Sequence, residues 1–202
     1  MVVEAAAEEA VVVVVAEEDR IKTKYINDIV WKKISGLEFD NQNAELTFSK
    51  RLARENRWPH WYALDVIEEY RKFLYLLQRA KHPVTPSIEV DQVWHLHLTY
   101  SEFYWEDFAK GMPVAPHHGP TRGGTDEDNK FIDWYSKTLE SYEQIFGNKP
   151  PVHIWPSKDE RFRANQSWAW IDVSKHFIID RNAGYVYILF IIFLMILVAT
   201  IF

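Results

Sequence analysis

The sequence predicts a mainly α-helical protein: a bundle of about five helices, then short extended segments and a C-terminal transmembrane helix. Apolar side chains recur at helical spacing through most of residues 18–150. Capping residues, glycines and prolines divide that region into separate helices. The last 18 residues contain no charged side chain, which is typical of a membrane span.

The first two predicted helices cover residues 18–34 and 44–55. In the first, Ile21, Tyr25 and Ile29 lie at helical spacing, so one face of the helix is apolar. The second helix has a similar apolar face, and it ends shortly before the proline that opens the next helix. Both faces are suited to packing within a bundle.

The third and fourth predicted helices form the middle of the bundle. Pro59 begins a helix that extends to Ala80, because proline is favoured in the first helical turn. Ser87 is a good N-cap for the fourth helix, which extends to Lys110 and ends at Gly111.

A loop rich in glycine, proline and histidine, residues 111–124, precedes the fifth predicted helix. Thr125 and Asp128 are reciprocal capping residues at the start of this helix. Its apolar residues recur at helical spacing as far as Phe146, and Gly147 ends it.

Composition divides the chain into four parts. Residues 1–17 are an acidic, low-complexity arm, for which a partner-binding helix is the alternative, and residues 18–150 are the helical domain. Residues 151–182 include VHIWP and SWAWIDV, which predict short strands or extended segments that cover the bundle and lead to the membrane. Residues 183–202 are a predicted transmembrane tail anchor.

The tail anchor also predicts location and partners. From Tyr185 to Phe202, a helix rising ~1.5 Å per residue would extend ~27 Å, close to the ~30 Å of a hydrocarbon core. The alternative, a buried core helix, would show a polar stripe, and this segment has none. Lys175 and Arg181 precede the span and no base follows it, so we expect the N-terminal domain on the cytoplasmic side. The expected partners are the lipid bilayer and other membrane proteins.

Charge and cysteine content exclude several classes of protein. The net charge is −6, but residues 1–20 carry six acids and one base, so the remaining 23 acids and 22 bases nearly balance. A nucleic-acid-binding protein would show a basic patch, and this sequence has none, so we expect no nucleic-acid partner. The absence of cysteine excludes disulfides, iron–sulfur clusters and cysteine-ligated zinc.

Histidines in the fourth helix and in the loop after it form a candidate metal site. Asp91, His95 and Glu102 share one face of a regular helix, whereas His97 points roughly the other way. The loop is long enough to fold back along the helix and to bring His117 and His118 to Asp91 and His95.

A site of Asp91, His95 and one or both loop histidines would suit one transition-metal ion, either Zn, Fe or Mn. In the alternative interpretation, Asp91 only orients His95 as a hydrogen-bonded strut beside Trp94, and His97 bonds to a tyrosine. The other four histidines are predicted to be surface or packing residues. Three acids could complete a site if their helices pack beside the fourth helix: Glu55, Glu68 and Glu69. Otherwise they are expected to be solvated or ion-paired.

Several blocks follow one another between residues 48 and 156: FSKRLARENRW, VIEEYRKFLYL, HPVTPSIEVDQVWHLHLTYSEFYWEDF, HHGPTRGGTDEDNKF, WYSKTLESYEQIFG and PPVHIWP. In composition and order they resemble the glycine-rich domain-containing protein-like family, in its bacterial form. The resemblance implies no particular reaction. It implies that the family's distinctive positions are Asp91, Trp94, His95, His97, His117 and His118. The chain differs from the plant members in having only seven glycines and an apolar segment in place of a glycine-rich tail.

Three functions are consistent with these observations. The first is a tail-anchored membrane protein whose helical domain binds or senses a metal. The second is a metal-dependent hydrolase, in which the metal activates water and Glu102 acts as general base. The third is a structural or accessory subunit of a membrane assembly. We favour a binding or accessory role, because the sequence contains no complete catalytic motif such as GxSxG, a Walker loop or HExxH.

Overall fold

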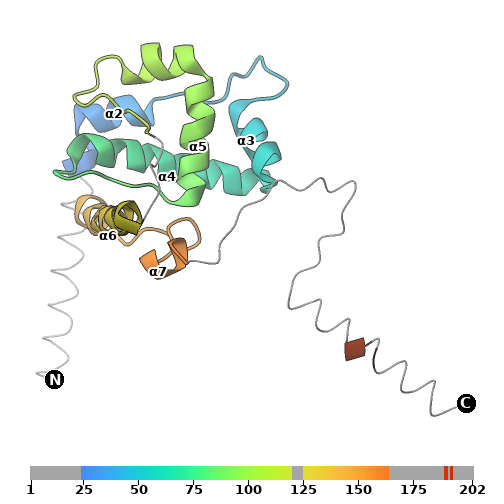
Figure 1. Ribbon diagram of the computed structural model, residues 1–202. Coiled ribbons are helices and arrows are strands. Elements are labelled where there is room, and N and C mark those ends of the chain that lie inside the picture. Colours follow the sequence, from blue (N-terminus) through green and yellow to red (C-terminus); the bar gives the residue numbers. More distant parts are fainter. Residues whose placement is uncertain (1–23, 120–124, 164–188, 191, 193–202) are drawn as a thin grey trace, which may run out of the picture. The chain divides into compact units, whose positions relative to one another are not determined.

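The computed structural model describes residues 24–119, 125–163, 189–190 and 192 (Figure 1). The described part is helical and contains no strand, which confirms the predicted mainly α-helical class. The elements are α2 (Ile29–Ser35), α3 (Phe48–Asn56), α4 (His60–Arg79), α5 (Ile88–Thr99), the π-helix η1 (Phe103–Ala109), α6 (Thr125–Phe146) and α7 (Lys158–Arg161).

Helix α4 is the centre of the fold, since it contacts α2, α3, α5 and α6. Figure 1 shows α5 crossing α4 at a steep angle, with α3 near one end of α4. Apolar and aromatic residues on α4 are fully buried, among them Val66, Tyr70, Phe73 and Leu74. The core therefore forms around α4 as each neighbouring helix buries its apolar face against it.

The first two predicted helices differ from the observed ones at their starts. The predicted helix 18–34 is interrupted within its described part at Asp28, whose extended backbone makes it the N-cap of α2. The second begins at Phe48 rather than at Ala44, because Thr47 is the N-cap of α3. In both cases the helix begins where a side-chain oxygen of the N-cap residue accepts a hydrogen bond from a backbone N–H group in the first turn.

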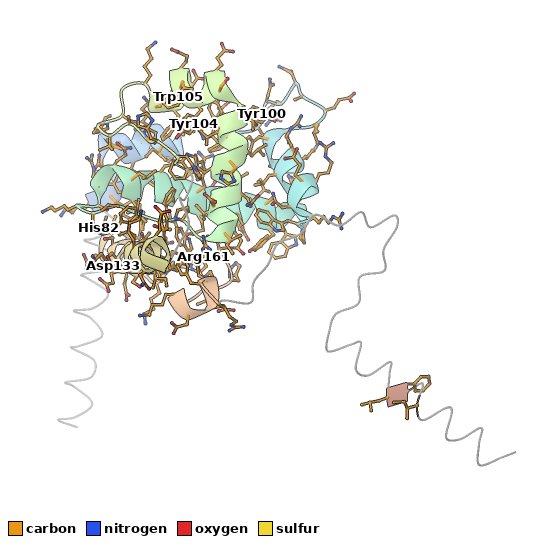
Figure 2. All side chains as sticks on the ribbon, in the orientation of Figure 1. His82, Tyr100, Tyr104, Trp105, Asp133 and Arg161 are labelled. Carbon is orange, nitrogen blue, oxygen red and sulfur yellow. The ribbon has the colours of Figure 1, made fainter. Side chains whose placement is uncertain are left out.

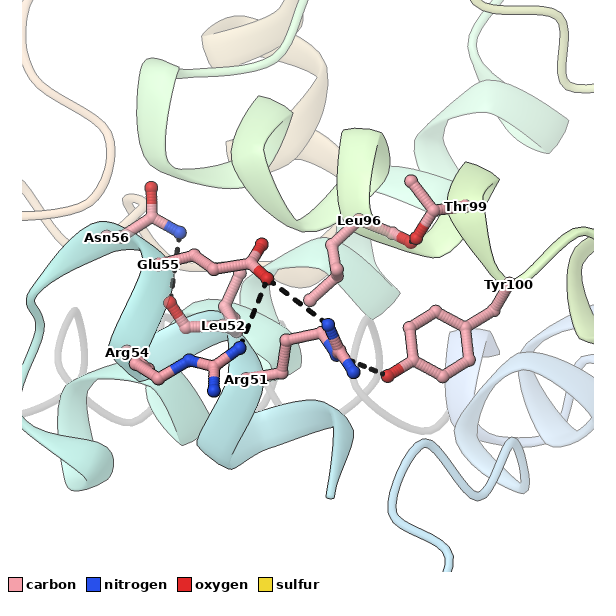
Figure 3. Close-up of polar contacts among 8 residues, drawn as sticks. All are labelled: Arg51, Leu52, Arg54, Glu55, Asn56, Leu96, Thr99 and Tyr100. Carbon is pink, nitrogen blue, oxygen red and sulfur yellow. Dashed lines mark hydrogen bonds and ion pairs between the residues drawn. The ribbon is translucent and has the colours of Figure 1, made fainter. Parts of the chain in front are cut away.

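The predicted single helix from Ser87 to Lys110 is broken at Tyr100, where φ is −88° and ψ is 62°. Two side-chain bonds accompany the break. The Thr99 hydroxyl donates to the Leu96 carbonyl at 2.7 Å, and Arg51 Nε of α3 donates to the Tyr100 hydroxyl at 3.1 Å (Figure 3). The chain then resumes as the π-helix η1, a form often found at functional sites.

The remaining predicted helices agree with the structure. α4 and α6 match the predicted ranges 59–80 and 125–146, and Ser87 caps α5 by accepting a hydrogen bond from Val90 N at 3.2 Å. Gly111 and Gly147 have positive φ angles of 78° and 77°, which glycine adopts without strain.

The prediction of extended segments is wrong for residues 151–163, which form a turn and then α7. One residue of this segment packs into the bundle. The Trp155 side chain is buried, and its indole N–H donates to Glu69 Oε2 at 2.9 Å. Glu69 Oε1 accepts from Lys72 Nζ at 2.8 Å and from the Tyr142 hydroxyl at 3.2 Å. This buried carboxylate thus joins α4, α6 and the turn before α7.

The chain divides into two units, Met1–Arg163 and Ala164–Phe202, and all the helices named above lie in the first. The predicted acidic arm 1–17 and linker 164–182 fall outside the described residues, as does the anchor 183–202 except for three positions. Among the residues that are described, no helix has the length and apolar character needed to cross a bilayer.

Asp28 links α2 to the end of α4. Its Oδ2 accepts hydrogen bonds from the Tyr75 hydroxyl at 2.8 Å and from Arg79 Nε at 2.7 Å, and its Oδ1 accepts from Val30 N at 2.9 Å. The hydrogen bond from Arg79 is the main cause that lowers the pKa of Asp28 to about 2, against the opposing effect of burial.

We expect Asp28→Asn to lower the free energy of unfolding by about 2 kcal/mol at pH 7, because the charge-assisted bonds from Arg79 are lost while the amide oxygen can still cap α2. The folded-state pKa of Asp28 lies below its unfolded value. Its contribution is therefore complete above about pH 4 and declines as the pH falls towards 2. Urea unfolding at pH 7, 4 and 2.5 measures this.

Asp133→Asn is the matched control, because Asp133 pairs with Lys137 on an exposed helix face. We expect this variant to change stability by less than about 0.5 kcal/mol. An Asp28→Asn deficit that stays constant from pH 7 to 2.5 would contradict the assigned role of the carboxylate.

Candidate metal centre

Helix α5 places Asp91 and His95 one turn apart on the same face, as predicted. His95 Nε2 lies 3.7 Å from Asp91 Oδ2. The His95 side chain is half exposed, and that of Asp91 is about one-quarter exposed, at 50% and 25% respectively. Solvent therefore reaches the pair from one side.

The loop after η1 brings His118 to this pair. His118 Nε2 lies 2.9 Å from Asp91 Oδ1, and the ring centroids of His95 and His118 are 4.6 Å apart. One ligand atom from each of Asp91, His95 and His118 lies within 4.8 Å of the other two. The structure thus brings together three of the four residues that the sequence predicted as metal ligands.

A chain of buried hydrogen bonds holds the loop against α5. The indole N–H of Trp94 donates to the Tyr104 hydroxyl at 2.9 Å, and that hydroxyl donates to the carbonyl of Pro116. Burial raises the pKa of Tyr104 to about 12, so the hydroxyl keeps the proton that it donates. Tyr104 belongs to η1, and Figure 2 labels it near the upper end of α5 in that view.

A second tie fixes the same loop to α4. Gln78 bonds to Val114 at both ends of its amide: Nε2 donates to the Val114 carbonyl at 3.0 Å, and Oε1 accepts from Val114 N at 2.9 Å. The Trp94 ring then meets the His118 ring edge-on, with centroids 4.6 Å apart. Trp94 thus packs against one of the three candidate ligands.

The structure does not bring His117 or Glu102 into this cluster. The exposed ring of His117 lies 5.8 Å from that of Trp105, and exposed Glu102 sits at the start of η1. The break at Tyr100 separates Glu102 from the helix face that carries Asp91. Adjacent histidines in a loop point in different directions, so only His118 joins the site.

His97 has a separate, structural position. It is completely buried on the opposite side of α5, where its Nδ1 lies 3.0 Å from the Tyr70 hydroxyl. Burial is the main cause that lowers the pKa of His97 to about 3, with the charge of Arg71 adding to it. His97 is thus a neutral core residue at neutral pH. This agrees with the prediction that the two histidines of the WHLH stretch have different roles.

The remaining candidates lie elsewhere. His60 bonds to Ser49, His82 bonds to Ser141, and the His153 ring lies beside Tyr62, while His176 falls outside the described residues. Glu55 pairs with Arg51 and Arg54 (Figure 3), Glu68 pairs with Arg71, and Glu69 is the buried link described above. These residues stabilise helix packing or lie on the surface.

The donor set of the cluster fits a transition metal. Two imidazole nitrogens and one carboxylate oxygen are ligands that zinc, iron and manganese accept. With metal–ligand bonds of about 2.1 Å, tetrahedral ligand atoms lie about 3.4 Å apart. The widest separation here is within 4.8 Å, so a small movement of the exposed His95 ring is enough for binding.

We expect Tyr104→Phe to lower the free energy of unfolding by about 1–3 kcal/mol, because Trp94 Nε1 and the Pro116 carbonyl would lose their buried partner. The same change should weaken metal binding about tenfold, since the loop that carries His118 is less well held. Urea unfolding and calorimetric metal titration measure the two effects.

Tyr62→Phe is the control, because it also removes one tyrosine hydroxyl, the donor of a hydrogen bond to the His153 carbonyl, outside the site. It should leave metal affinity unchanged. Equal metal affinity for Tyr104→Phe and the parent chain would show that Tyr104 does not position the site.

Two plant proteins of Arabidopsis thaliana are similar to this chain. "Glycine-rich domain-containing protein 1" is 27% identical and "Glycine-rich domain-containing protein 2" is 23% identical, each over 90 residues. Each match covers 42% of this chain but only 11% of the plant protein. No protein-family model and no solved structure matches the chain. These similarities support the resemblance to glycine-rich domain-containing proteins, and the bacterial form and the anchor remain predictions.

Proposed function

We propose that the helical domain binds one transition-metal ion, Zn, Fe or Mn, through Asp91, His95 and His118. The proposal rests on the convergence of these three side chains from a helix and a distant loop, with their ligand atoms within 4.8 Å of one another. The buried Trp94–Tyr104–Pro116 bonds support it, because they hold the loop at the position that a shared ligand set requires. Within this proposal the domain is a metal-binding or sensing module.

A second candidate function is metal-dependent hydrolysis. Three protein ligands are the set that catalytic zinc sites use, because a fourth position stays open for water. The half-exposed His95 supports this candidate, since solvent reaches the cluster on that side. Glu102, the general base considered from the sequence, is not part of the cluster, so a base would have to come from elsewhere.

We also propose that residues 183–202 attach the domain to a membrane as a single-pass anchor, with the domain on the cytoplasmic side. The charge-free run from Tyr185 to Phe202 and the preceding bases Lys175 and Arg181 support this arrangement. An accessory role beside other membrane proteins is supported by exposed apolar side chains such as Trp61 and Val152, which are 63% and 70% exposed.

For metal binding, we expect the purified full chain to hold close to one equivalent of a transition metal by elemental analysis. His118→Ala and Asp91→Ala should each lower its affinity at least about a hundredfold, because either change leaves two ligands. His117→Ala is the matched control, since it removes the neighbouring imidazole outside the cluster. Equal losses in His117→Ala and His118→Ala would rule out the proposed ligand set.

For membrane attachment, we expect the full chain to stay with the membrane fraction after carbonate extraction. Phe193→Arg combined with Ile196→Arg should release it, because each charge near the centre of a span costs about 2.5–3.5 kcal/mol. Ile29→Arg is the control, since it places the same charge on an exposed apolar position of the bundle, where Ile29 is 76% exposed. A parent chain that is fully extracted by carbonate would refute the anchor.

A further inference from the structure

The Arg161 side chain is close enough to the first turns of α5 to feel the charges of Glu89 and Asp91, and it forms no hydrogen bond or ion pair with the side chains that the structure describes. It is the last residue of α7, whose N-cap is Ser157. The preceding turn is fixed in the core by the buried Trp155. Figure 2 labels Arg161 beside the lower end of α5, which is its N-terminal end and carries Asp91. Arg161 thus has a defined place near the end of α5 that carries Asp91.

The guanidinium of Arg161 has unmet hydrogen-bonding capacity. Its Nε is buried and has no hydrogen-bond partner. Burial lowers the pKa of Arg161, while the charges of Asp91 and Glu89 act in the opposite direction. An arginine side chain remains protonated in proteins and carries five N–H donors. A partly buried guanidinium without an acceptor is costly, so a ligand from outside the chain is a natural acceptor.

Glu89, whose charge acts on Arg161, also has a buried polar atom without a hydrogen-bond partner. It lies in the first turn of α5, and its Oε2 is buried without a hydrogen-bond partner. Glu89 and Arg161 influence each other electrostatically, yet they do not approach within ion-pair distance in the described structure. Because Glu89 and Arg161 form no ion pair with each other, the guanidinium of Arg161 can still donate hydrogen bonds to another group.

A bound metal ion would change the charge around Arg161. Without the metal, the carboxylates of Glu89 and Asp91 outweigh the single guanidinium, which disfavours an anion. A divalent ion on Asp91, His95 and His118 makes the net charge of the same groups positive. Anion binding at Arg161 and metal binding at the cluster should therefore strengthen each other by the same factor.

We propose that Arg161 binds an oxyanion group, either phosphoryl or carboxylate, of the molecule that occupies the open position of the metal centre. The planar, forked guanidinium suits both groups, because it donates two parallel hydrogen bonds to two oxygens. This inference rests on the proposed metal function and deepens it: the metal would hold one end of an anionic ligand, and Arg161 would hold its charged group.

The test uses the full chain in non-ionic detergent, loaded with Mn²⁺. Electron paramagnetic resonance first measures Mn²⁺ binding, and ³¹P relaxation then measures the binding of methylphosphonate near the bound ion. Proton relaxation of acetate is the parallel measurement for a carboxylate. We compare the parent chain with Arg161→Gln and Arg161→Lys, and with Arg163→Gln, which removes an exposed arginine two residues away.

We expect at least one probe to bind the Mn²⁺-loaded parent chain, and Arg161→Gln to weaken that binding about ten- to a hundredfold. Arg161→Lys should retain part of it because the charge remains, and Arg163→Gln should bind as the parent does. Mn²⁺ and the probe should each raise the affinity for the other. Whichever of methylphosphonate and acetate binds more tightly identifies the group.

Two results would overturn this inference, and they are distinguishable. If Mn²⁺ binds to the cluster but neither probe depends on Arg161, the oxyanion site is wrong and the metal function stands. If Mn²⁺ does not bind to the parent chain, the metal function fails, and the oxyanion site that rests on it fails too.

Discussion

The candidate site depends on the two hydrogen bonds that the Tyr104 hydroxyl group makes. It accepts a hydrogen bond from the Trp94 indole on α5 and donates one to the Pro116 carbonyl in the loop. Both bonds are buried, so water cannot replace either partner if the hydroxyl is lost. His118 follows Pro116 by two residues, and its distance from Asp91 is therefore set by a bond that lies outside the cluster.

The rest of the fold places Tyr104 where it can make these bonds. α5 ends at Thr99 and the chain turns at Tyr100, so η1 directs Tyr104 and Phe108 into the core while Trp105 stays partly exposed. In the centre of the molecule, α4 supplies Tyr70 as the partner of the buried His97. One segment thus carries two kinds of histidine: His97 belongs to the core, and His95 faces solvent at the cluster.

Local signals in the sequence were sufficient for part of this structure. The bounds of α4 and α6, the Ser87 cap and the shared face of Asp91 and His95 follow from spacing and capping alone. The break at Tyr100 could not be predicted, because it accompanies a bond to Arg51, far along the chain. Asp28 is a residue type that favours the N-cap, but its bond to Arg79 has no local signal in the sequence. Within the site, no local sequence signal predicts that His118 rather than His117 joins Asp91 and His95. Nor does any local signal predict that Arg161 lies near α5.

The most direct test of the metal site is X-ray absorption at the zinc K-edge on the full chain loaded with one equivalent of zinc. We predict a first shell of nitrogen and oxygen at about 2.0–2.1 Å, with the outer-shell scattering of two imidazoles. In His118→Ala the imidazole scattering should fall to that of one ring. A spectrum without imidazole scattering in the parent chain, like that of hydrated zinc, would contradict the account.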